Sequence, residues 1–352
     1  MFSAPCGMKT EKKRGAAASF FLKKREATPY VRYEMTRQKK LLLVIGMIFA
    51  PVLALIATIL RAAALFTEYE AGSTYFTDHA ILHTTFLWVC GISLLLLLVF
   101  VVVCRKDIPA PSYQNSLSIL FSSAFFIVAL IVSALLGFLA IPAASTALTK
   151  FFWLIAALCS LVAPLYFAFF FKADHSKSSL HGMLGLAPAF VFLLNAMLFY
   201  FDRSMQMNAP AKMLHLFAFL LLSCYFITES RGILLQAKPA LFCFLAAASL
   251  LFSAAASIPN LLYHLVAGQA LALHSAYDFL LLAAALYTLA RLLQMLPYER
   301  PAIHSLVQSI LRRRADSAEV PEEEAIAPEE VPADILPPPE AEEPDEGTED
   351  DQ

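Results

Sequence analysis

The chain has 352 residues, of which 59% are hydrophobic and 15% are charged. Soluble globular chains carry roughly 45–50% apolar and about 25% charged residues, and the mean hydropathy of +0.66 departs in the same direction. The composition therefore excludes a soluble enzyme, a disordered protein and a nucleic-acid-binding domain as the main body of the chain.

The first 40 residues are expected to form a basic cytoplasmic segment. Their apolar stretch Ala16–Leu22 is shorter than most hydrophobic cores of signal peptides, and Lys23, Lys24 and Arg25 follow it without a small-residue cleavage site. This pattern argues against a cleaved signal peptide. Met35, directly before the first long apolar run, is also typical of a translation start, so the start could lie at Met1 or at Met35.

Residues 41–296 contain eight apolar runs of a length that crosses a bilayer core about 30 Å thick. They are Leu41–Leu60, Ile81–Cys104, Leu117–Ile141, Phe151–Phe171, Gly182–Phe201, Met213–Thr228, Ala240–Ile258 and Leu271–Leu296. Runs this long exclude barrel strands, because only helices satisfy the backbone of such segments within lipid. The sequence predicts an all-α integral membrane protein with an eight-helix transmembrane bundle, whose sixth run is the shortest.

Proline residues punctuate this pattern. Pro142, Pro210, Pro239 and Pro259 fall between runs, where they predict connections. Three further prolines lie inside runs, where they can kink a helix without breaking it: Pro51, Pro164 and Pro188.

The chain after the last run divides by charge. Residues 297–314 form a short basic juxtamembrane segment that ends in Arg312, Arg313 and Arg314. Residues 315–352 hold sixteen acidic residues, seven prolines and no Lys or Arg. A stretch of this composition buries too little apolar surface to offset the entropy of ordering it, so we expect a disordered acidic tail.

Lysine and arginine residues predict the orientation. With eight spans, 22 of the 26 basic residues fall on the side of both termini. The other side has only four, which are Arg61, Lys150, Arg203 and Lys212. Because cytoplasmic loops are enriched in basic residues, we expect a multi-pass protein of the plasma membrane with both termini in the cytoplasm.

Histidine residues gather towards the predicted outer side. His79 and His83 share a helix face four residues apart, and the same spacing separates His274 from Asp278 in the last span. His215 lies about one turn into the sixth span. An ionisable group within lipid is costly and is a candidate for function. We therefore hypothesise that His83, His215, His274 and Asp278 converge at a polar site in the outer leaflet.

Three interpretations of this pattern stay open at the level of sequence. Imidazole and carboxylate groups are suitable ligands for a divalent metal, with His79 as a further candidate. The same groups can relay protons near neutral pH. Alternatively, amphipathic side chains simply collect where helices end at the membrane interface. The chain shows no zincin motif, no nucleotide-binding glycine loop and no nucleophile elbow, so no catalytic residue is assigned.

Three other polar residues lie in or beside the spans. Asn195 falls in the middle of the fifth span, where an interhelical hydrogen bond explains it. Glu229 follows the sixth span and Arg291 ends the eighth, and here ion pairing or snorkelling at the inner boundary is expected.

The sequence supports three functional hypotheses. The first is a non-enzymatic scaffold, regulator or accessory subunit that binds a protein partner through its acidic tail. The second is a secondary transporter of a small solute or ion that uses the outer His/Asp site. The third is a membrane-embedded metal-dependent hydrolase. The lipid bilayer is a partner in each of them, and none involves nucleic acid.

Overall fold

The computed structural model describes residues 37–70, 75–77, 79–111, 116–142, 144, 146–171, 179–202, 206, 208–234, 238–266 and 273–296. The basic segment before residue 37, the juxtamembrane segment 297–314 and the acidic tail 315–352 lie outside this described part.

Eight helices are long and apolar enough to cross a membrane, which confirms the predicted fold class. The elements are α2 (Arg37–Thr67), β1 (Tyr69–Glu70), β2 (Tyr75–Phe76), α3 (Ile81–Cys104), α4 (Leu117–Ala140), α5 (Ala147–Ala168) with η1 (Phe169–Phe171), α6 (Ser179–Leu184) with α7 (Leu186–Phe201), α8 (Pro210–Ile233), α9 (Pro239–Val266) and α10 (Leu273–Gln294).

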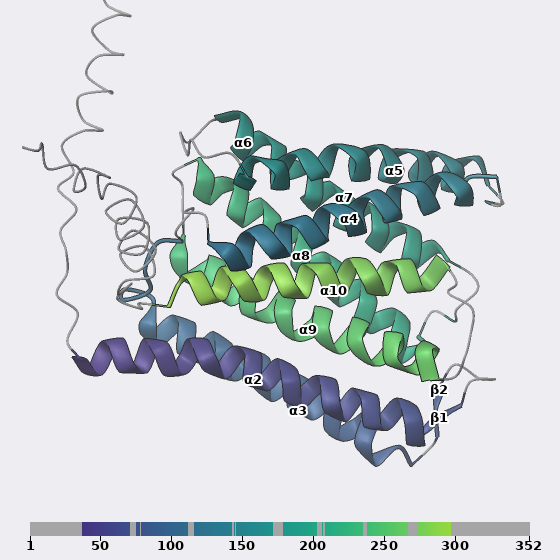
Figure 1. The fold of residues 1–352 in the computed structure, drawn as a ribbon. Helices are drawn as coiled ribbons and strands as arrows, with labels where there is room; N and C mark the ends of the chain where they lie inside the picture. The colour runs from purple at the N-terminus through teal and green to yellow at the C-terminus, as the bar shows by residue number, and fades with distance from the viewer. Residues whose placement is uncertain are drawn as a thin grey trace, which may run out of the picture. The chain divides into compact units, whose positions relative to one another are not determined.

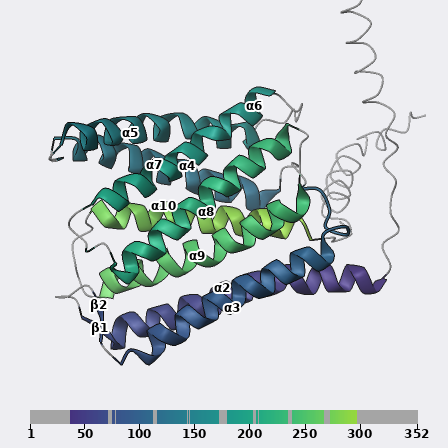
Figure 2. The ribbon, with the colours of Figure 1, turned by 180° about the vertical axis from the view of Figure 1, so that it is seen from behind.

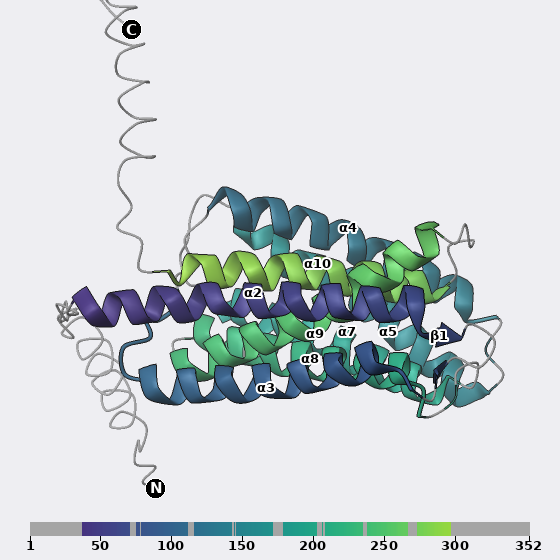
Figure 3. The ribbon, with the colours of Figure 1, turned by 90° about the horizontal axis from the view of Figure 1, so that it is seen from below.

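The helices run along a common axis in three layers (Figures 1 and 2). Helices α2 and α3 lie side by side on one face, as the view from below also shows (Figure 3). Helices α8, α9 and α10 form the middle, and α4, α5 and α7 cover the other side. The short antiparallel hairpin β1–β2 marks one end of the bundle, which we call the hairpin end. We call the other end, where α2 begins and α10 ends, the terminal end.

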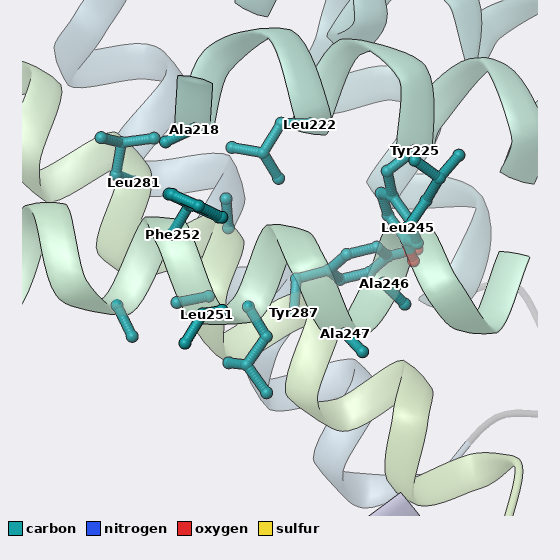
Figure 4. Close-up of a cluster of buried hydrophobic side chains, with 14 of the residues drawn as sticks. Ala218, Leu222, Tyr225, Leu245, Ala246, Ala247, Leu251, Phe252, Leu281 and Tyr287 are labelled. Carbon is teal, nitrogen blue, oxygen red and sulfur yellow. The ribbon is translucent and has the colours of Figure 1, made fainter. Parts of the chain in front are cut away.

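Helix α9 is the most buried span and contacts α2, α3, α8 and α10. Its sequence explains this position, because it is rich in alanine and serine. Small side chains let neighbouring helices approach closely within a membrane. The stretches Ala246–Ser249 and Ser253–Ser257 are entirely buried. Larger side chains from α8 and α10, such as Leu222, Leu281 and Tyr287, pack against α9 (Figure 4).

The outer helices present leucine, isoleucine, valine and phenylalanine outwards. Leu55 on α2, Val103 on α3 and Leu135 on α4 are more than half exposed. A soluble protein would bury such a continuous apolar surface, whereas lipid covers it at no cost. This surface agrees with the bilayer contact that the composition predicts.

Local sequence signals set several helix ends. The hydroxyls of Ser116 and Thr146 accept hydrogen bonds from the third residue of α4 and α5 respectively, as N-capping residues do. Pro210 and Pro239 are the first residues of α8 and α9, where the missing amide hydrogen of proline has no intrahelical partner to lose.

Three spans extend beyond their predicted C-terminal ends. Helix α2 continues to Thr67 instead of Leu60, and α8 continues to Ile233 instead of Thr228. Helix α9 runs through Pro259 to Val266, so the prediction that Pro259 lies in a connection is wrong. A proline is tolerated inside a membrane helix when the surrounding packing satisfies the freed backbone groups. These extensions bring Arg61, Glu229 and Asn260 into helices.

Candidate functional site at the hairpin end

His215 and Asp278 meet in the interior of the bundle. His215 lies on the second turn of α8 and Asp278 on the second turn of α10. Nε2 of the imidazole is 2.7 Å from Oδ1 of the carboxyl group, and the side chains are 5% and 2% exposed. The structure thus brings together two of the four residues that were expected to converge.

The hydrogen bonds of His215 fix how many protons this pair carries. Nδ1 is 2.8 Å from the carbonyl oxygen of Ala211. A carbonyl can only accept, so Nδ1 bears a hydrogen. Nε2 and Asp278 Oδ1 are close enough that one of them must donate to the other. The pair therefore holds one more proton, either as imidazolium beside carboxylate or as neutral imidazole beside carboxylic acid, and it is electrically neutral in both forms.

Other side chains enclose the pair. Nδ2 of Asn260, on α9, donates to Asp278 Oδ1 over 3.2 Å. The ring of Phe199, at the end of α7, stacks on the His215 ring with centroids 5.0 Å apart. The pair is thus held by four helices, because the elements α7, α8, α9 and α10 each contribute one side chain.

A second polar group lies beside the pair and centres on Arg61 of α2. Arg61 is 1% exposed, and its Nη1 donates to Nδ1 of His83 over 3.4 Å. His83 must therefore carry its own hydrogen on Nε2. Arg61 also lies close enough to Asp278 for their opposite charges to attract.

Glu68 and the β1–β2 hairpin hold this second group in place. The two carboxylate oxygens of Glu68 accept hydrogen bonds from the backbone amides of Leu82 and His83, each at 2.9 Å. Such a carboxylate satisfies the unpaired amides at the start of α3. On the hairpin, the ring of Phe76 stacks on His83 with centroids 4.0 Å apart.

Tyr69, on β1, contacts two rings at this end. Its ring meets those of Phe76 and Tyr263 edge-on. Burial and the neighbouring Tyr263 raise the pKa of the Tyr69 hydroxyl above its ordinary value, although Arg61 opposes this shift. The hydroxyl is therefore protonated at neutral pH and adds no negative charge near Arg61.

Neither His79 nor His83 joins the pair. His79 is exposed, and the side chain of His274 lies outside the described part of the chain. His83 contacts Arg61 instead of Asp278. Among the described side chains, no group of three or more His, Cys, Asp or Glu residues is arranged to hold a metal ion.

Glu229 and Arg291 form a separate cluster at the terminal end. Nε of Arg291 is 2.7 Å from Oε1 of Glu229, and both side chains are almost fully buried. The hydroxyl of Tyr287 donates to the same carboxylate over 3.0 Å. Of the two expectations for these residues, ion pairing is therefore found, and snorkelling is not. Asn195 is also buried, but its Nδ2 makes no hydrogen bond within the described residues.

Two residues of the hairpin end had no role in the sequence-based hypothesis. The charge of Arg61 predicts an outer flanking residue, although the apolar stretch Ala62–Phe66 after it indicates that the helix continues. Asn260 follows Pro259, and a proline at this position predicts a connection. In both cases the predicted helix end lies too early in the chain, so a polar side chain that is buried between helices was expected outside them.

Comparison with models of protein families found no match, and searches among curated proteins and among solved structures found none either. The fold and the buried polar groups define the class: a polytopic α-helical membrane protein.

Proposed function

We propose that this protein is a secondary transporter that couples the movement of a small solute to protons, with the His215–Asp278 pair as the proton-binding group. The observation that carries the proposal is the buried 2.7 Å contact between the imidazole and the carboxyl group. Ionisable side chains at depth in a membrane protein are expensive, and they mark proton and ion pathways.

The number of protons on the pair couples proton binding to the arrangement of α8 and α10. With its shared proton the pair is neutral and joins α8 to α10. Without that proton an unprotonated nitrogen would face a carboxylate, and the two acceptors would repel each other. Gain or loss of one proton therefore favours different arrangements of α8 and α10, which is what a coupled transporter requires.

The charged and titratable side chains on elements around the pair belong to this proposal. They include Arg61 on α2, His83 on α3, Asp202 after α7, Lys212 on α8, His264 on α9 and Tyr277 on α10. Arg61 and Lys212 are buried cations, so two of the four basic residues on this side are absent from the loops. The hairpin end is therefore even poorer in exposed positive charge than the sequence count suggests. This supports a plasma-membrane protein with the hairpin end outside and both termini in the cytoplasm.

The other two hypotheses gain less support. The scaffold or accessory-subunit hypothesis depends on the acidic tail, which lies outside the described residues, and it stays a prediction. A metal-dependent hydrolase needs at least three ligands and an open position for water. Both ring nitrogens of His215 are already engaged by Ala211 and Asp278, which favours proton binding over metal binding at this histidine.

The test is solute-driven proton movement in liposomes. The full chain is reconstituted with a pH-sensitive dye inside, and a panel of small anions, cations, sugars and amino acids is applied as gradients. We expect at least one solute to change the internal pH. Asp278→Asn should abolish that change, because the amide has the shape of the carboxyl group but cannot exchange the proton.

Glu70→Gln is the matched control, since Glu70 is an exposed carboxylate at the same end of the bundle. It should retain full proton movement. His215→Gln serves as a second variant if Asp278→Asn does not fold. A wild-type protein that moves no proton with any solute, or an Asp278→Asn variant that is as active as wild type, would show that the proposal is wrong.

A further inference from the structure

We propose that Arg61 is the binding group for the carboxylate of a small organic anion with an apolar body. As the substrate site of a transporter, this inference rests on the function proposed above. As a binding site, it can be tested without any transport measurement.

The environment of Arg61 is unusual for an arginine near the end of a membrane helix. Such side chains normally extend to the headgroups and water. Arg61 instead folds inwards and is 1% exposed. Its Nε makes no hydrogen bond within the described residues, and its one side-chain hydrogen bond there goes to a neutral histidine. A buried guanidinium with a free donor is costly unless an anion completes it.

Glu68 and Asp278, the described carboxylates nearest to Arg61, already have other partners. Both oxygens of Glu68 accept backbone amides of α3. Asp278 is engaged by His215 and Asn260, and within the described residues it forms no ion pair with Arg61. Arg61 thus has no direct ion pair with a described carboxylate, and its Nε–H remains as a donor to an external carboxylate.

The surroundings of the guanidinium indicate what the rest of the ligand is like. Cζ of Arg61 lies 4.8 Å from the ring centroid of Phe76 and 5.7 Å from that of Phe86. Phe66, Tyr69 and Tyr263 form a further set of contacting rings at this end. Aromatic walls favour an apolar or aromatic body attached to the carboxylate. Inorganic anions and strongly hydrated sugar acids are less compatible with these aromatic rings.

The position of Arg61 also connects anion binding to the proton. An anion at Arg61 offsets the positive charge that Asp278 experiences. Loss of the proton from the neutral His215–Asp278 pair would leave a second negative charge beside the bound anion, and the two like charges would repel each other. The expected coupling is therefore symport, in which the anion and one proton bind together.

The experiment measures binding of monocarboxylates to the purified full chain in phosphatidylcholine nanodiscs by calorimetry. The probes are acetate, benzoate and phenylacetate, and benzamide is the uncharged match for benzoate. We expect benzoate or phenylacetate to bind more tightly than acetate, and benzamide not to bind. Arg61→Gln should weaken binding at least about tenfold, and Arg61→Lys should weaken it less.

A second variant tests the same inference if Arg61→Gln does not fold. Phe76→Ala removes an aromatic wall from the hairpin and leaves Arg61 in place, so it should weaken benzoate more than acetate. Lys150→Gln is the matched control, because Lys150 is an exposed cation on the first turn of α5 and has no part in the proposed site. It should leave benzoate affinity unchanged.

Several results would overturn the inference. These are failure of all three carboxylates to bind, equal binding of benzamide, and an Arg61→Gln variant with wild-type affinity. The same holds if phosphatidylglycerol in the nanodisc displaces benzoate in proportion to its content, because a lipid phosphate would then be the ligand of Arg61.

The outcomes also separate this inference from the proposed function. Benzoate binding that depends on Arg61, without proton movement in liposomes, would support the anion site and contradict the proposed transport function. If another solute drives proton movement and the Arg61→Gln variant retains that movement, the result would support the transport function and contradict the anion site.

Discussion

Nε of Arg291 lies 2.7 Å from Oε1 of Glu229, so a polar contact joins α10 to α8 at the terminal end of the bundle. The contact between His215 and Asp278 joins the same two helices at the hairpin end. The two contacts are about 20 Å apart along the helix axes. Between them lie apolar side chains such as Leu222 and Leu281. The seam between α8 and α10 is thus polar at each end and apolar in the middle.

Loss of either partner of the Glu229–Arg291 pair is expected to destabilise the protein by about 3–5 kcal/mol, because the other charge is left buried and uncompensated. Arg291→Met and Glu229→Gln should each lower the thermal unfolding midpoint in detergent. The double variant should lose less than the two single losses combined. Arg231→Met, which removes an exposed arginine from the same helix as Glu229, is the control. Single variants as stable as wild type would contradict the prediction.

Gly185, between α6 and α7, has no room for a side chain. A Cβ there would collide with the hydroxyl of Ser230 and press on the ring of Tyr166. Gly185→Ala should therefore cost about 1–3 kcal/mol of stability. Gly91→Ala on α3 is the matched control, since a Cβ at Gly91 meets no atom within 4 Å. It should be neutral or slightly stabilising. Thermal unfolding of both variants checks this pair of expectations, and equal midpoints would count against it.

Leu281 on α10 is fully buried against the middle helices (Figure 4). Leu281→Ala should leave a cavity and destabilise the protein by about 2 kcal/mol or more. Leu293→Ala, on the same helix but nearly half exposed, should have a much smaller effect because lipid fills the space. The comparison of their unfolding midpoints tests whether the middle layer is the core of the bundle.

The proposed orientation predicts which loops a reagent outside the cell can reach. A cysteine introduced by Glu70→Cys on the hairpin should react with a membrane-impermeant maleimide in intact cells. A cysteine introduced by Asp107→Cys, in the connection after α3, should react only after the membrane is opened. The parent chain provides the background, because its described cysteines lie in the spans. The reverse pattern would invert the sidedness.

The number and type of the spans followed from the sequence because each helix has to be apolar over the thickness of the bilayer. The ends were harder to place. A charge or a proline predicts the end of a span at Arg61, Glu229 and Pro259, whereas the helix continues through each of them. Hydropathy alone does not distinguish a polar residue that faces water from one that faces another helix.

The candidate site was predictable only in part for the same reason. The positions of His215 and Asp278 near helix starts on one side indicated that they could meet, and they do. Their spatial partner Asn260 and the neighbouring Arg61 depend on which helices are adjacent. That arrangement is set by the packing of small residues on α9. The sequence of α9 does not indicate which helices pack against these residues. The two-residue strands of the hairpin are likewise too short to give a periodic pattern.

The central position of α9 has a consequence for biogenesis. Helices α2 and α3 pack mainly on each other and on α9, yet a chain inserted from its N-terminus delivers them to the bilayer long before α9 has been synthesised. Until then, α2 lacks the helix against which it packs most extensively, and Arg61 has only its neighbours on α3 and the hairpin. Helices α2 and α3 must therefore either stay at the insertion machinery or enter the bilayer with the cation of Arg61 still exposed. Assembly of the native bundle is completed only after α9, the seventh span, has been inserted.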